Sequence, residues 1–476
     1  MNAPAGASME SVLAAWLPGQ RWYPAKGRAV SMRVLADLTL ADPAHADMAS
    51  SGSGGDGTRV SVVIVDLGLG EDLASALQVP IVARREPVPG RPEGFIGLLA
   101  TSQGPRHLYD GPHDAAYVEV LAVMLRERAT VRCASGWVAS VPTTMPESVT
   151  APPAASRVLS GEQSNTSVIT TFASGAGSII KIFRSLQSGE NPDITLQTAL
   201  AAAGSTRVPA PIGYVRGGWT DPHGRPVVAD LAFASEFLPD APDAWRTATV
   251  AVERGRGFEA DALDLGAATA EVHLALASAL PSEPATADRL AALAASLSNR
   301  IRWAVEAAPE LARYADGARA VVAAVTRVSE APDWQRIHGD LHLGQVLRPP
   351  GRGWVLLDFE GEPLRPLPER IALDTPLRDV AGMLRSFDYA ARRVTVGLAP
   401  GPATDAAIER ADAWATAARD AYCRGYAAVS GRDPRSYPIV LAALELEKAL
   451  YEVVYETRNR PSWLPIPLHA VARLLG

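Results

Sequence analysis

Cysteine is scarce in this sequence. Only two cysteines, Cys133 and Cys423, occur among 476 residues, and they lie far apart along the chain. A disulfide framework needs several cysteines at short spacings, as in small secreted domains. We therefore expect a protein that folds without disulfides in a reducing compartment, with both cysteines acting as small buried apolar side chains.

Long apolar runs are also missing. Residues 1–8 lack the basic segment followed by an apolar stretch that a secretory signal needs. No uninterrupted apolar run reaches the roughly 18 residues that a membrane-spanning helix requires. With 47% hydrophobic and 20% charged residues, the composition predicts a globular cytoplasmic protein without a membrane partner.

Positive charge is too sparse for a nucleic-acid partner. The chain has 45 Lys and Arg against 52 Asp and Glu, which gives a formal net charge of -7. Most basic residues are dispersed, whereas neutralising phosphates requires them in clusters. The charge balance therefore favours a small-molecule partner.

The length and the apolar pattern predict three domains. Residues 1–150 form a β-rich domain with strands at 32–40, 59–67 and 78–84 and a helix at 115–128. A segment rich in Pro, Ser and Thr at 142–155 marks its end. Residues 151–238 form a second β-rich domain with strands at 156–159, 167–172, 178–183, 208–215 and 227–235 around a helix at 189–200. Residues 239–476 are helical, with helices expected at 261–280, 286–308, 311–329, 378–393, 404–429 and 436–458.

Residues of the second domain suggest a nucleotide site. Lys181 lies inside the apolar run 179–183, and a buried lysine is rare unless it is paired or functional. We predict that Lys181 holds the α- and β-phosphates. The turn 161–166, which contains Ser164 and Asn165, would offer backbone N–H groups and small polar side chains to the same phosphates.

The strand at 227–235 ends in Glu236-Phe-Leu238-Pro. In a two-lobed nucleotide-binding enzyme, a strand followed by a short connector that ends in proline is typical of the hinge between the lobes. We therefore expect the backbone N–H and C=O groups of Glu236 and Leu238 to form hydrogen bonds with the edge of the adenine ring.

The richest stretch for chemistry is 335–362. A carboxylate, Asp340, is followed five residues later by the amide of Gln345, and Asp358 follows the next strand. This interval is that of a kinase catalytic loop and its metal-binding aspartate. Asp340 would orient an acceptor hydroxyl, and Gln345 and Asp358 offer the oxygen ligands that Mg²⁺ prefers.

Two other interpretations of this stretch are a zinc site and a hydrolytic His/Asp pair. Histidines at alternate positions without a nearby cysteine suit zinc poorly, and no Gly-x-Ser-x-Gly turn occurs. His338 is better explained as a residue that fixes the loop, and His342 is a candidate contact to the acceptor.

The helix at 436–458 carries charge on a largely apolar surface. Glu445, Lys448 and Glu452 lie at steps of three and four residues and therefore share a face. A solvated ion-paired surface would look similar, but the apolar surroundings favour the wall of a polar substrate pocket.

Several motifs together resemble a known family. They are His338-Gly-Asp-x-His-x-Gly-Gln, Asp358-Phe-Glu-Gly-Glu-Pro, Trp16-Leu-Pro-x-Gln-Arg-Trp-Tyr, Lys181-x-Phe-Arg, Asn191-Pro-Asp, Pro376-Leu-Arg-Asp-Val-Ala-Gly, Glu447-Lys-Ala-x-Tyr-Glu and Arg460-Pro-x-Trp-Leu-Pro-Ile-Pro. The chain is similar to the maltokinase and actinobacterial glucosamine kinase branch of the aminoglycoside phosphotransferase superfamily, which is kinase-like.

The resemblance implies an α+β fold with two protein-kinase-like lobes, a β-rich N-lobe and a helical C-lobe, preceded by a β-rich N-terminal cap. It also implies ATP and Mg²⁺ as cofactors, a sugar as acceptor, and the roles given above for Lys181, Asp340, Gln345 and Asp358. We expect a monomer.

One position departs from the family pattern. Maltokinase-like sequences tend to carry a glutamate after Asn-Pro-Asp, where this chain has Thr195. The ion-pair partner of Lys181 is then expected to be Asp193 or Glu190.

The resemblance leaves the sugar open. Glucosamine, phosphorylated on its 6-hydroxyl, and maltose, phosphorylated on its anomeric hydroxyl, are the two acceptors within the branch. The segment 23–28 of the cap is nearer to the glucosamine kinases, and Glu445 and Glu452 would favour a cationic amino sugar. An aminoglycoside phosphotransferase fits less well because of the cap, and a catalytically silent regulator fits less well because no metal ligand is lost.

Overall fold

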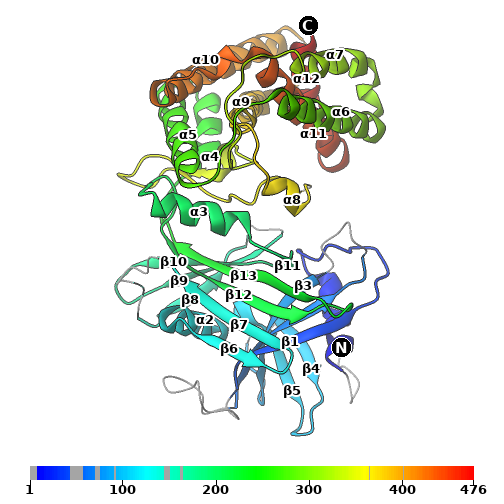
Figure 1. Cartoon of the computed structure of the whole chain (residues 1–476), viewed down its shortest axis with the longest axis vertical. Coiled ribbons are helices and arrows are strands. Elements are labelled where there is room, and N and C mark those ends of the chain that lie inside the picture. Colours follow the sequence, from blue (N-terminus) through cyan, green and yellow to red (C-terminus); the bar gives the residue numbers. More distant parts are fainter. Residues whose placement is uncertain are drawn as a thin grey trace. The chain divides into compact units, whose positions relative to one another are not determined.

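The computed structural model describes residues 8–42, 57–69, 76–90, 93–143, 149, 151–160, 164–363, 365–399 and 401–476. The chain forms two compact units, drawn in Figure 1. Unit 1 is Met1–Thr195 with Ala210–Pro239, and unit 2 is Leu196–Pro209 with Asp240–Gly476. Each unit has an apolar core of its own.

Unit 1 contains an antiparallel sheet whose central strands are buried on both faces. Among the described residues its strands are β1 (Arg33–Ala41), β2 (Arg59–Asp66), β3 (Ala76–Arg84), β5 (Arg106–Asp110) and β4 (Phe95–Leu99) in spatial order, with β11 (Ser185–Leu186) paired to β3. Along β2, Val62 and Ile64 belong to one buried cluster and Val63 and Val65 to another. Successive side chains of a strand point to opposite faces, so β2 is apolar throughout instead of alternating. The strands predicted at 32–40, 59–67 and 78–84 are confirmed.

Unit 1 contains a second antiparallel sheet. Its described strands, in spatial order, are β6 (Thr130–Cys133), β7 (Gly136–Pro142), β12 (Pro211–Thr220), β13 (Pro226–Glu236), β10 (Gly177–Ile182), β9 (Thr166–Thr171) and β8 (Ala155–Val158). Helix α2 (Ala115–Glu127) packs on β7 and adds Leu121 and Met124 to the core. The predicted domain boundary at residue 150 thus separates strands that share one sheet, and the division into three domains stays a prediction.

Smaller helices flank the sheets of unit 1. Helix α1 (Met9–Trp16) packs on β4 and β1. Helix α3 (Pro192–Ala202) begins in unit 1 and continues into unit 2. Its proline stands in the first turn, where no N–H is required.

Unit 2 is mainly helical, as predicted. Its elements are α4 (Ala244–Glu253), α5 (Glu259–Ala279), α6 (Ala287–Ala307), α7 (Ala315–Val325), the short hairpin β14 (Val346–Leu347) and β15 (Val355–Leu356), α8 (Leu367–Arg370), α9 (Leu377–Arg392), α10 (Pro402–Ser430), α11 (Pro438–Asn459) and α12 (Pro465–Leu475). Every residue of α9 except Arg378 is buried, including Asp379 and Arg385. Buried charges require partners, so α9 organises the polar contacts of this unit.

Helices α5 and α10 cross at glycines. A Cβ at Gly266 would lie 2.0 Å from the carbonyl oxygen of Tyr422, and one at Gly425 would lie 1.9 Å from that of Leu263. Neither position can hold a larger residue without moving the helices apart.

Three helices were not predicted. Helix α4 follows the predicted hinge segment, and the four-residue helix α8 lies in a proline-containing stretch. Helix α12 begins within the proline-rich segment 461–467 that we read as the end of the helical region. Prolines are compatible with the first turn of a helix because its N–H groups have no intrahelical partners.

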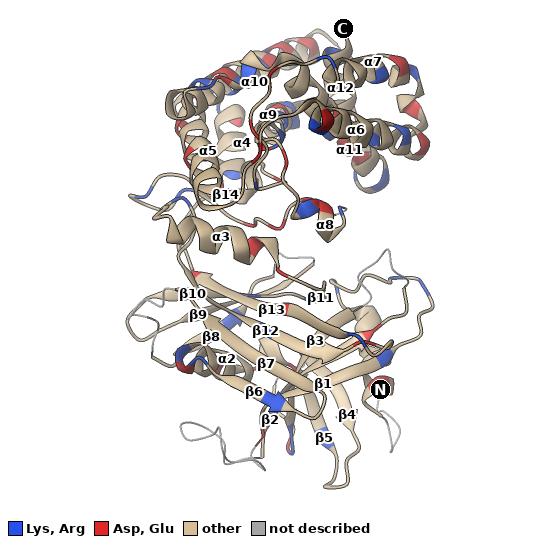
Figure 2. Cartoon of the chain, viewed as in Figure 1, with Lys and Arg blue, Asp and Glu red and all other residues tan. Residues whose placement is uncertain are grey.

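The surface charge is mixed, and Figure 2 shows Lys and Arg interspersed with Asp and Glu along α6, α7 and α10. In the part of the chain that the structure describes, none of the helices combines the length and the apolarity needed to cross a bilayer.

Candidate active site

The hairpin β14–β15 in unit 2 brings the two predicted metal ligands together. Gln345 ends a 3-10 turn immediately before β14, and Asp358 follows β15. The N–H of Leu357 donates to the carbonyl of Gln345 at 2.9 Å, and the Gln345 side-chain amide donates to Asp358 Oδ2 at 2.9 Å. Strand pairing therefore fixes both side chains beside each other, as the sequence predicted.

Asp358 has a left-handed backbone, with φ of 62°. Only glycine, asparagine and aspartate visit this region readily. Nearby, Gly339 and Gly361 also have positive φ, and a Cβ at Gly339 would lie 3.2 Å from the Cα of Gly361. The loops that carry Asp340 and Asp358 therefore approach through glycine backbone.

His338 fixes the loop, in agreement with the prediction. Its Nε2–H donates to the carbonyl of Leu357 at 2.7 Å, which leaves Nδ1 to accept the N–H of Asp340 at 3.3 Å. The ring also packs on Phe359, with 4.6 Å between centroids. One tautomer of His338 thus ties the loop that carries Asp340 to the Asp358 segment.

Asp379, on α9, accepts hydrogen bonds from the backbone of the loop that carries Asp340. Its Oδ2 accepts the N–H of His338 and its Oδ1 that of Gly339, both at 2.8 Å. His273 on α5 lies 3.0 Å from Oδ2, and its other nitrogen lies 2.9 Å from the hydroxyl of Tyr426. Although burial acts to raise the pKa of Asp379, the hydrogen bond and charge of His273 outweigh it and lower that pKa. An ionised Asp379 therefore fixes the backbone that presents Asp340.

We predict that Asp379→Asn lowers both activity and stability. The new amide would face two backbone N–H donors with one acceptor oxygen. The loss of a charge-assisted buried hydrogen bond should lower the free energy of unfolding by about 3 kcal/mol. Displacement of the loop should lower kcat about a hundredfold. Denaturant unfolding and ADP release measure the two effects.

Asp433→Asn is the matched control for this prediction, because its carboxylate pairs with Arg435 at the surface, at 2.7 Å. Its expected cost is below about 1 kcal/mol. Equal losses in the two variants would contradict the role given to Asp379.

Asp340 is paired with Lys448 of α11. Lys448 Nζ donates to Asp340 Oδ1 at 2.8 Å. Burial acts to raise the pKa of Asp340, but Lys448, His342 and His338 outweigh it and hold that pKa below its usual value. Burial also lowers the pKa of His342, despite the nearby Asp340. The site therefore contains an ionised carboxylate and a neutral imidazole.

The segment of α11 that carries Lys448 is held by a buried ion-pair network. Glu447 accepts from Arg365 at 2.7 Å, pairs with Arg300 at 3.2 Å and also bonds Arg378. Burial acts to raise the pKa of Glu447, but the three guanidinium groups lower it to about 2. This charge stays ionised at all ordinary pH values and fixes the helix at the position of Lys448.

A cavity of about 300 Å³ lies beside the Asp340–Lys448 pair, within unit 2. Lys448, Glu452 and His342 line its polar side. Of the predicted acceptor-binding residues, these three therefore converge on one space, which is large enough for a small-molecule substrate.

Aromatic rings form the other side of this cavity. Tyr389, Tyr451, Tyr455, Trp463 and Trp245 line it. Such rings suit the apolar faces of a sugar, and their N–H and O–H groups suit its hydroxyls.

Glu445, the other predicted acceptor-binding carboxylate of α11, does not line this cavity. Seven residues along a helix correspond to about 10 Å, so Glu445 shares the face of Glu452 but not its position. Its carboxylate accepts from Arg419 of α10 at 2.8 and 3.0 Å, and it is not among the residues lining the 300 Å³ cavity. A contact between Glu445 and a substrate is thus a prediction without support from this geometry.

In unit 1, Lys181 is paired with Asp193. Lys181 Nζ lies 3.2 Å from Asp193 Oδ2, and the two side chains are 15% and 3% exposed. Thr195, at the position that departs from the family pattern, instead donates to Glu190 at 3.3 Å. Asp193, one of the two residues predicted, is therefore an ion-pair partner of Lys181.

The remaining predicted nucleotide contacts also lie in unit 1. Ser164 is exposed and Asn165 half-buried at the start of β9, while residues 161–163 of the same turn lie outside the described residues. Glu236 ends β13, and its N–H donates to the carbonyl of Ala210 at 2.9 Å. Leu238 directly precedes Pro239, the last residue of unit 1, so the predicted hinge lies where the chain passes into unit 2.

The sequence did not assign roles to Asp379, Arg385 or the aromatic wall. Asp379 belongs to the family motif Pro376-Leu-Arg-Asp-Val-Ala-Gly. The motif indicates that the residue has a role, but it does not indicate which residues Asp379 contacts. Tyr389 and Trp245 carry no signal, because aromatic residues at helical spacing look like ordinary core.

Comparisons with known proteins agree with the motifs. The maltokinase N-terminal cap domain family matches residues 16–114. A glucosamine kinase of Mycolicibacterium smegmatis is 31% identical over 339 residues, covering 67% of this chain and 79% of that protein. A glucosamine kinase of Streptacidiphilus jiangxiensis is 32% identical over 344 residues, covering 68% and 74%.

Solved structures share the fold. A glucosamine kinase in complex with glucosamine, ADP and inorganic phosphate is similar with a TM-score of 0.66 and 23% identity, covering 99% of this chain and 100% of that one. A second crystal form of a glucosamine kinase gives 0.68 and 24%, covering 98% and 100%. The predicted α+β, two-lobed kinase-like fold with an N-terminal cap is confirmed. Because relatives more than 30% identical match two thirds of this chain and most of their own length, the chain belongs to the glucosamine kinase family.

Proposed function

We propose that this protein transfers the γ-phosphoryl group of ATP to the 6-hydroxyl of glucosamine. The observation that carries the proposal is the 300 Å³ cavity in which Glu452 and aromatic rings lie beside the Asp340–Lys448 pair. The named activity of both sequence relatives favours glucosamine over maltose. The scarcity of cysteine supports a cytoplasmic location, and we retain the expectation of a monomer.

Asp340 orients the acceptor hydroxyl in this mechanism. The hydroxyl oxygen forms a bond to the γ-phosphorus while the bond to the β–γ bridging oxygen breaks, and ADP leaves. The hydroxyl proton passes to the Asp340 carboxylate. Lys448 bonds Oδ1, and among the described residues no hydrogen bond reaches Oδ2, which is the oxygen for the acceptor. A carboxylate with a lowered pKa suits phosphoryl transfer, which needs positioning more than a strong base.

Gln345 and Asp358 fit a Mg²⁺ ion. Their side chains are already 2.9 Å apart, and both offer hard oxygen atoms on a backbone fixed by the β14–β15 hairpin. Bound there, the ion would neutralise phosphate charge.

Lys181 would bind the α- and β-phosphates, since it is a largely buried cation held in place by Asp193. We propose that Ser164 and Asn165 cover the phosphates and that the backbone of Glu236 and Leu238 contacts adenine.

The acceptor is proposed to bind through Glu452 and the aromatic wall. Glu452 would accept hydrogen bonds from the ammonium group, and Lys448 and His342 would contact the hydroxyl groups. Charge-assisted bonds of this kind distinguish an amino sugar from a neutral one.

A panel assay of ADP release with glucosamine, glucose, maltose and kanamycin tests the proposal. We expect turnover with glucosamine at a kcat/KM at least tenfold above the other three, and a phosphate monoester at the primary carbon in the ³¹P–¹H spectrum of the product. Preference for maltose with an anomeric phosphate, or no turnover with any acceptor, would reject it.

A further inference from the structure

The two oxygens of Glu452 have different surroundings. Oε2 accepts twice from Arg385 of α9, at 2.6 Å from Nη2 and 3.1 Å from Nε. Among the described residues, no hydrogen bond reaches Oε1. The Glu452 side chain is 11% exposed and lines the 300 Å³ cavity. One oxygen is therefore tied to Arg385, and the other is available to the cavity.

Arg385 is a bridge between two carboxylates. Its side chain is fully buried, and its third nitrogen, Nη1, donates to Asp388 Oδ2 at 2.6 Å. A guanidinium group has a fixed planar fork of donors, so fixing Nη1 on one carboxylate also fixes Nε and Nη2 on the other. The position of Glu452 is thus set by the position of Asp388.

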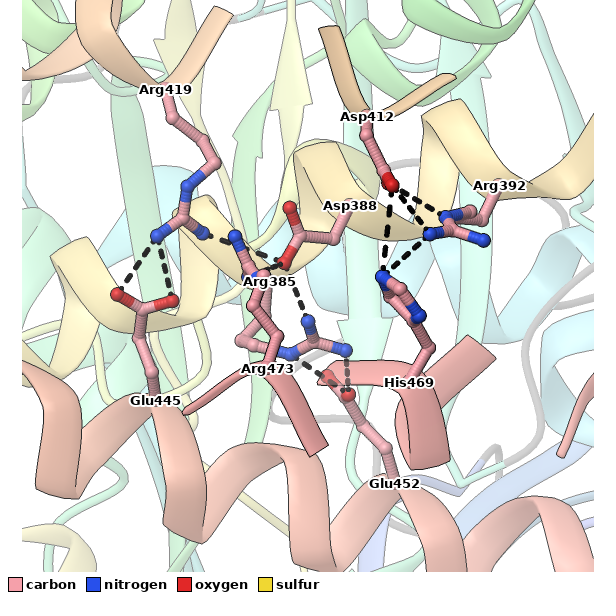
Figure 3. Close-up of polar contacts among 9 residues, drawn as sticks. All are labelled: Arg385, Asp388, Arg392, Asp412, Arg419, Glu445, Glu452, His469 and Arg473. Atoms are coloured by element: carbon pink, nitrogen blue, oxygen red, sulfur yellow. Dashed lines mark hydrogen bonds and ion pairs between the residues drawn. The ribbon is translucent and has the colours of Figure 1, made fainter. Parts of the chain in front are cut away.

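Asp388 is itself anchored by two further arginines, as Figure 3 shows. Its Oδ2 accepts from Arg473 of α12 at 2.6 Å and from Arg419 of α10 at 3.5 Å, and Arg419 is paired with Glu445. The contacts from Arg473 to Glu452 form one continuous chain of ion pairs. Helix α12, at one end, is thereby linked to the cavity wall at the other.

The charges of this network balance. Arg385, Arg419 and Arg473 face Asp388, Glu445 and Glu452, three cations against three anions. Burial raises the pKa of Glu452 above its usual value, and the nearby Arg385 limits that rise. Without Arg385, a buried Glu452 would tend to become neutral and would lose its attraction for a cation.

We propose that Arg385 is a positioning residue for the amino group of the acceptor, and that Arg473 supports it through Asp388. The inference rests on the proposed function, because it takes Glu452 as the carboxylate that meets the ammonium group. It adds a role for α12: this helix sets the acceptor preference without contacting the acceptor.

The experiment compares Arg385→Lys, Arg473→Gln and Glu452→Gln in the full chain. The readouts are KM for glucosamine, KM for ATP, kcat, and the inhibition constant of glucose, a neutral competitor. We expect Arg385→Lys and Glu452→Gln each to raise KM for glucosamine about tenfold, with kcat, KM for ATP and the glucose constant changed less than twofold. Because both act on one interaction, the double variant should be no worse than either single one.

Arg473→Gln keeps the proposal testable if Arg385→Lys does not fold, since the Arg473 side chain is 41% exposed. Its expected effect is a rise of about threefold in KM for glucosamine, because Arg385 and Arg419 still hold Asp388. Arg435→Gln is the matched control. That arginine is 43% exposed, pairs with Asp433 and Asp420, and contacts no member of the network, so its KM should equal that of the wild type.

The outcomes are distinct. Equal changes for glucosamine and glucose, or Arg473→Gln behaving as Arg435→Gln does, would overturn the positioning role while the kinase activity stands. A wild-type enzyme that does not phosphorylate glucosamine would overturn the proposed function, and the role given to Arg385 with it.

Discussion

Replacing Asp340 by asparagine should lower kcat by about a thousandfold while KM for ATP changes less than threefold. The substitution keeps the shape of the side chain and removes its ability to take the acceptor proton. It also removes the charge that Lys448 faces at 2.8 Å. The measurement is ADP release at saturating glucosamine and ATP.

The effect should be confined to the reaction. The hydrogen bonds that hold the loop come from the backbone of His338 and Gly339, not from the Asp340 side chain. Thermal unfolding of Asp340→Asn should therefore lie within a few degrees of the wild type. Retention of full activity would reject Asp340 as the acceptor-orienting residue.

The pKa of Asp340 adds a prediction for the wild type. Because this pKa lies below its usual value, the carboxylate stays ionised as the pH falls from 7 toward 5. Protonation of Asp340 should thus not contribute to any loss of kcat in that range. The kcat–pH profile at saturating substrates measures it, and an acidic limb that disappears in Asp340→Asn would contradict it.

The grouping of the residues proposed for catalysis and metal binding could be predicted because it is local. Gln345 and Asp358 flank one hairpin and Asp340 shortly precedes it, so their spacing in sequence largely determines their geometry. In unit 1, the pairing of β9 with β10 is equally local. The pairings of β7 with β12 and of β10 with β13 join strands that are distant in sequence, so the order of the sheet could not be predicted in the same way.

The supporting shell could not be predicted because its contacts are distant in sequence. Asp379 bonds the loop that carries Asp340 across 41 residues of sequence, and Arg385 bonds Glu452 across 67. In the sequence alone, the charged residues of α9 are indistinguishable from the solvent-exposed face of an amphipathic helix, although the structure buries nearly all of them. For the same reason Glu445 and Glu452 seemed equivalent by helical period, although one faces Arg419 and the other the cavity.

Asparagine at position 358 should lower kcat by about a thousandfold, since the loss of one anionic Mg²⁺ ligand removes several kcal/mol of charge stabilisation. The choice of asparagine matters because the backbone at this position has φ of 62°, which asparagine adopts as readily as aspartate. Its amide oxygen can still accept from Gln345. Rates measured against total Mg²⁺ at fixed ATP should show an apparent affinity at least tenfold weaker than in the wild type.

Asp358→Ala separates this electrostatic loss from backbone strain. Alanine in the left-handed region costs about 1–2 kcal/mol, so this variant should lose as much activity as Asp358→Asn and unfold at a lower denaturant concentration. If asparagine instead kept the wild-type response to Mg²⁺, Asp358 would not be a metal ligand, and its left-handed conformation would serve only to connect β15 to the loop that follows. Equal stability of the two variants would show that the strain is relieved by movement of the loop.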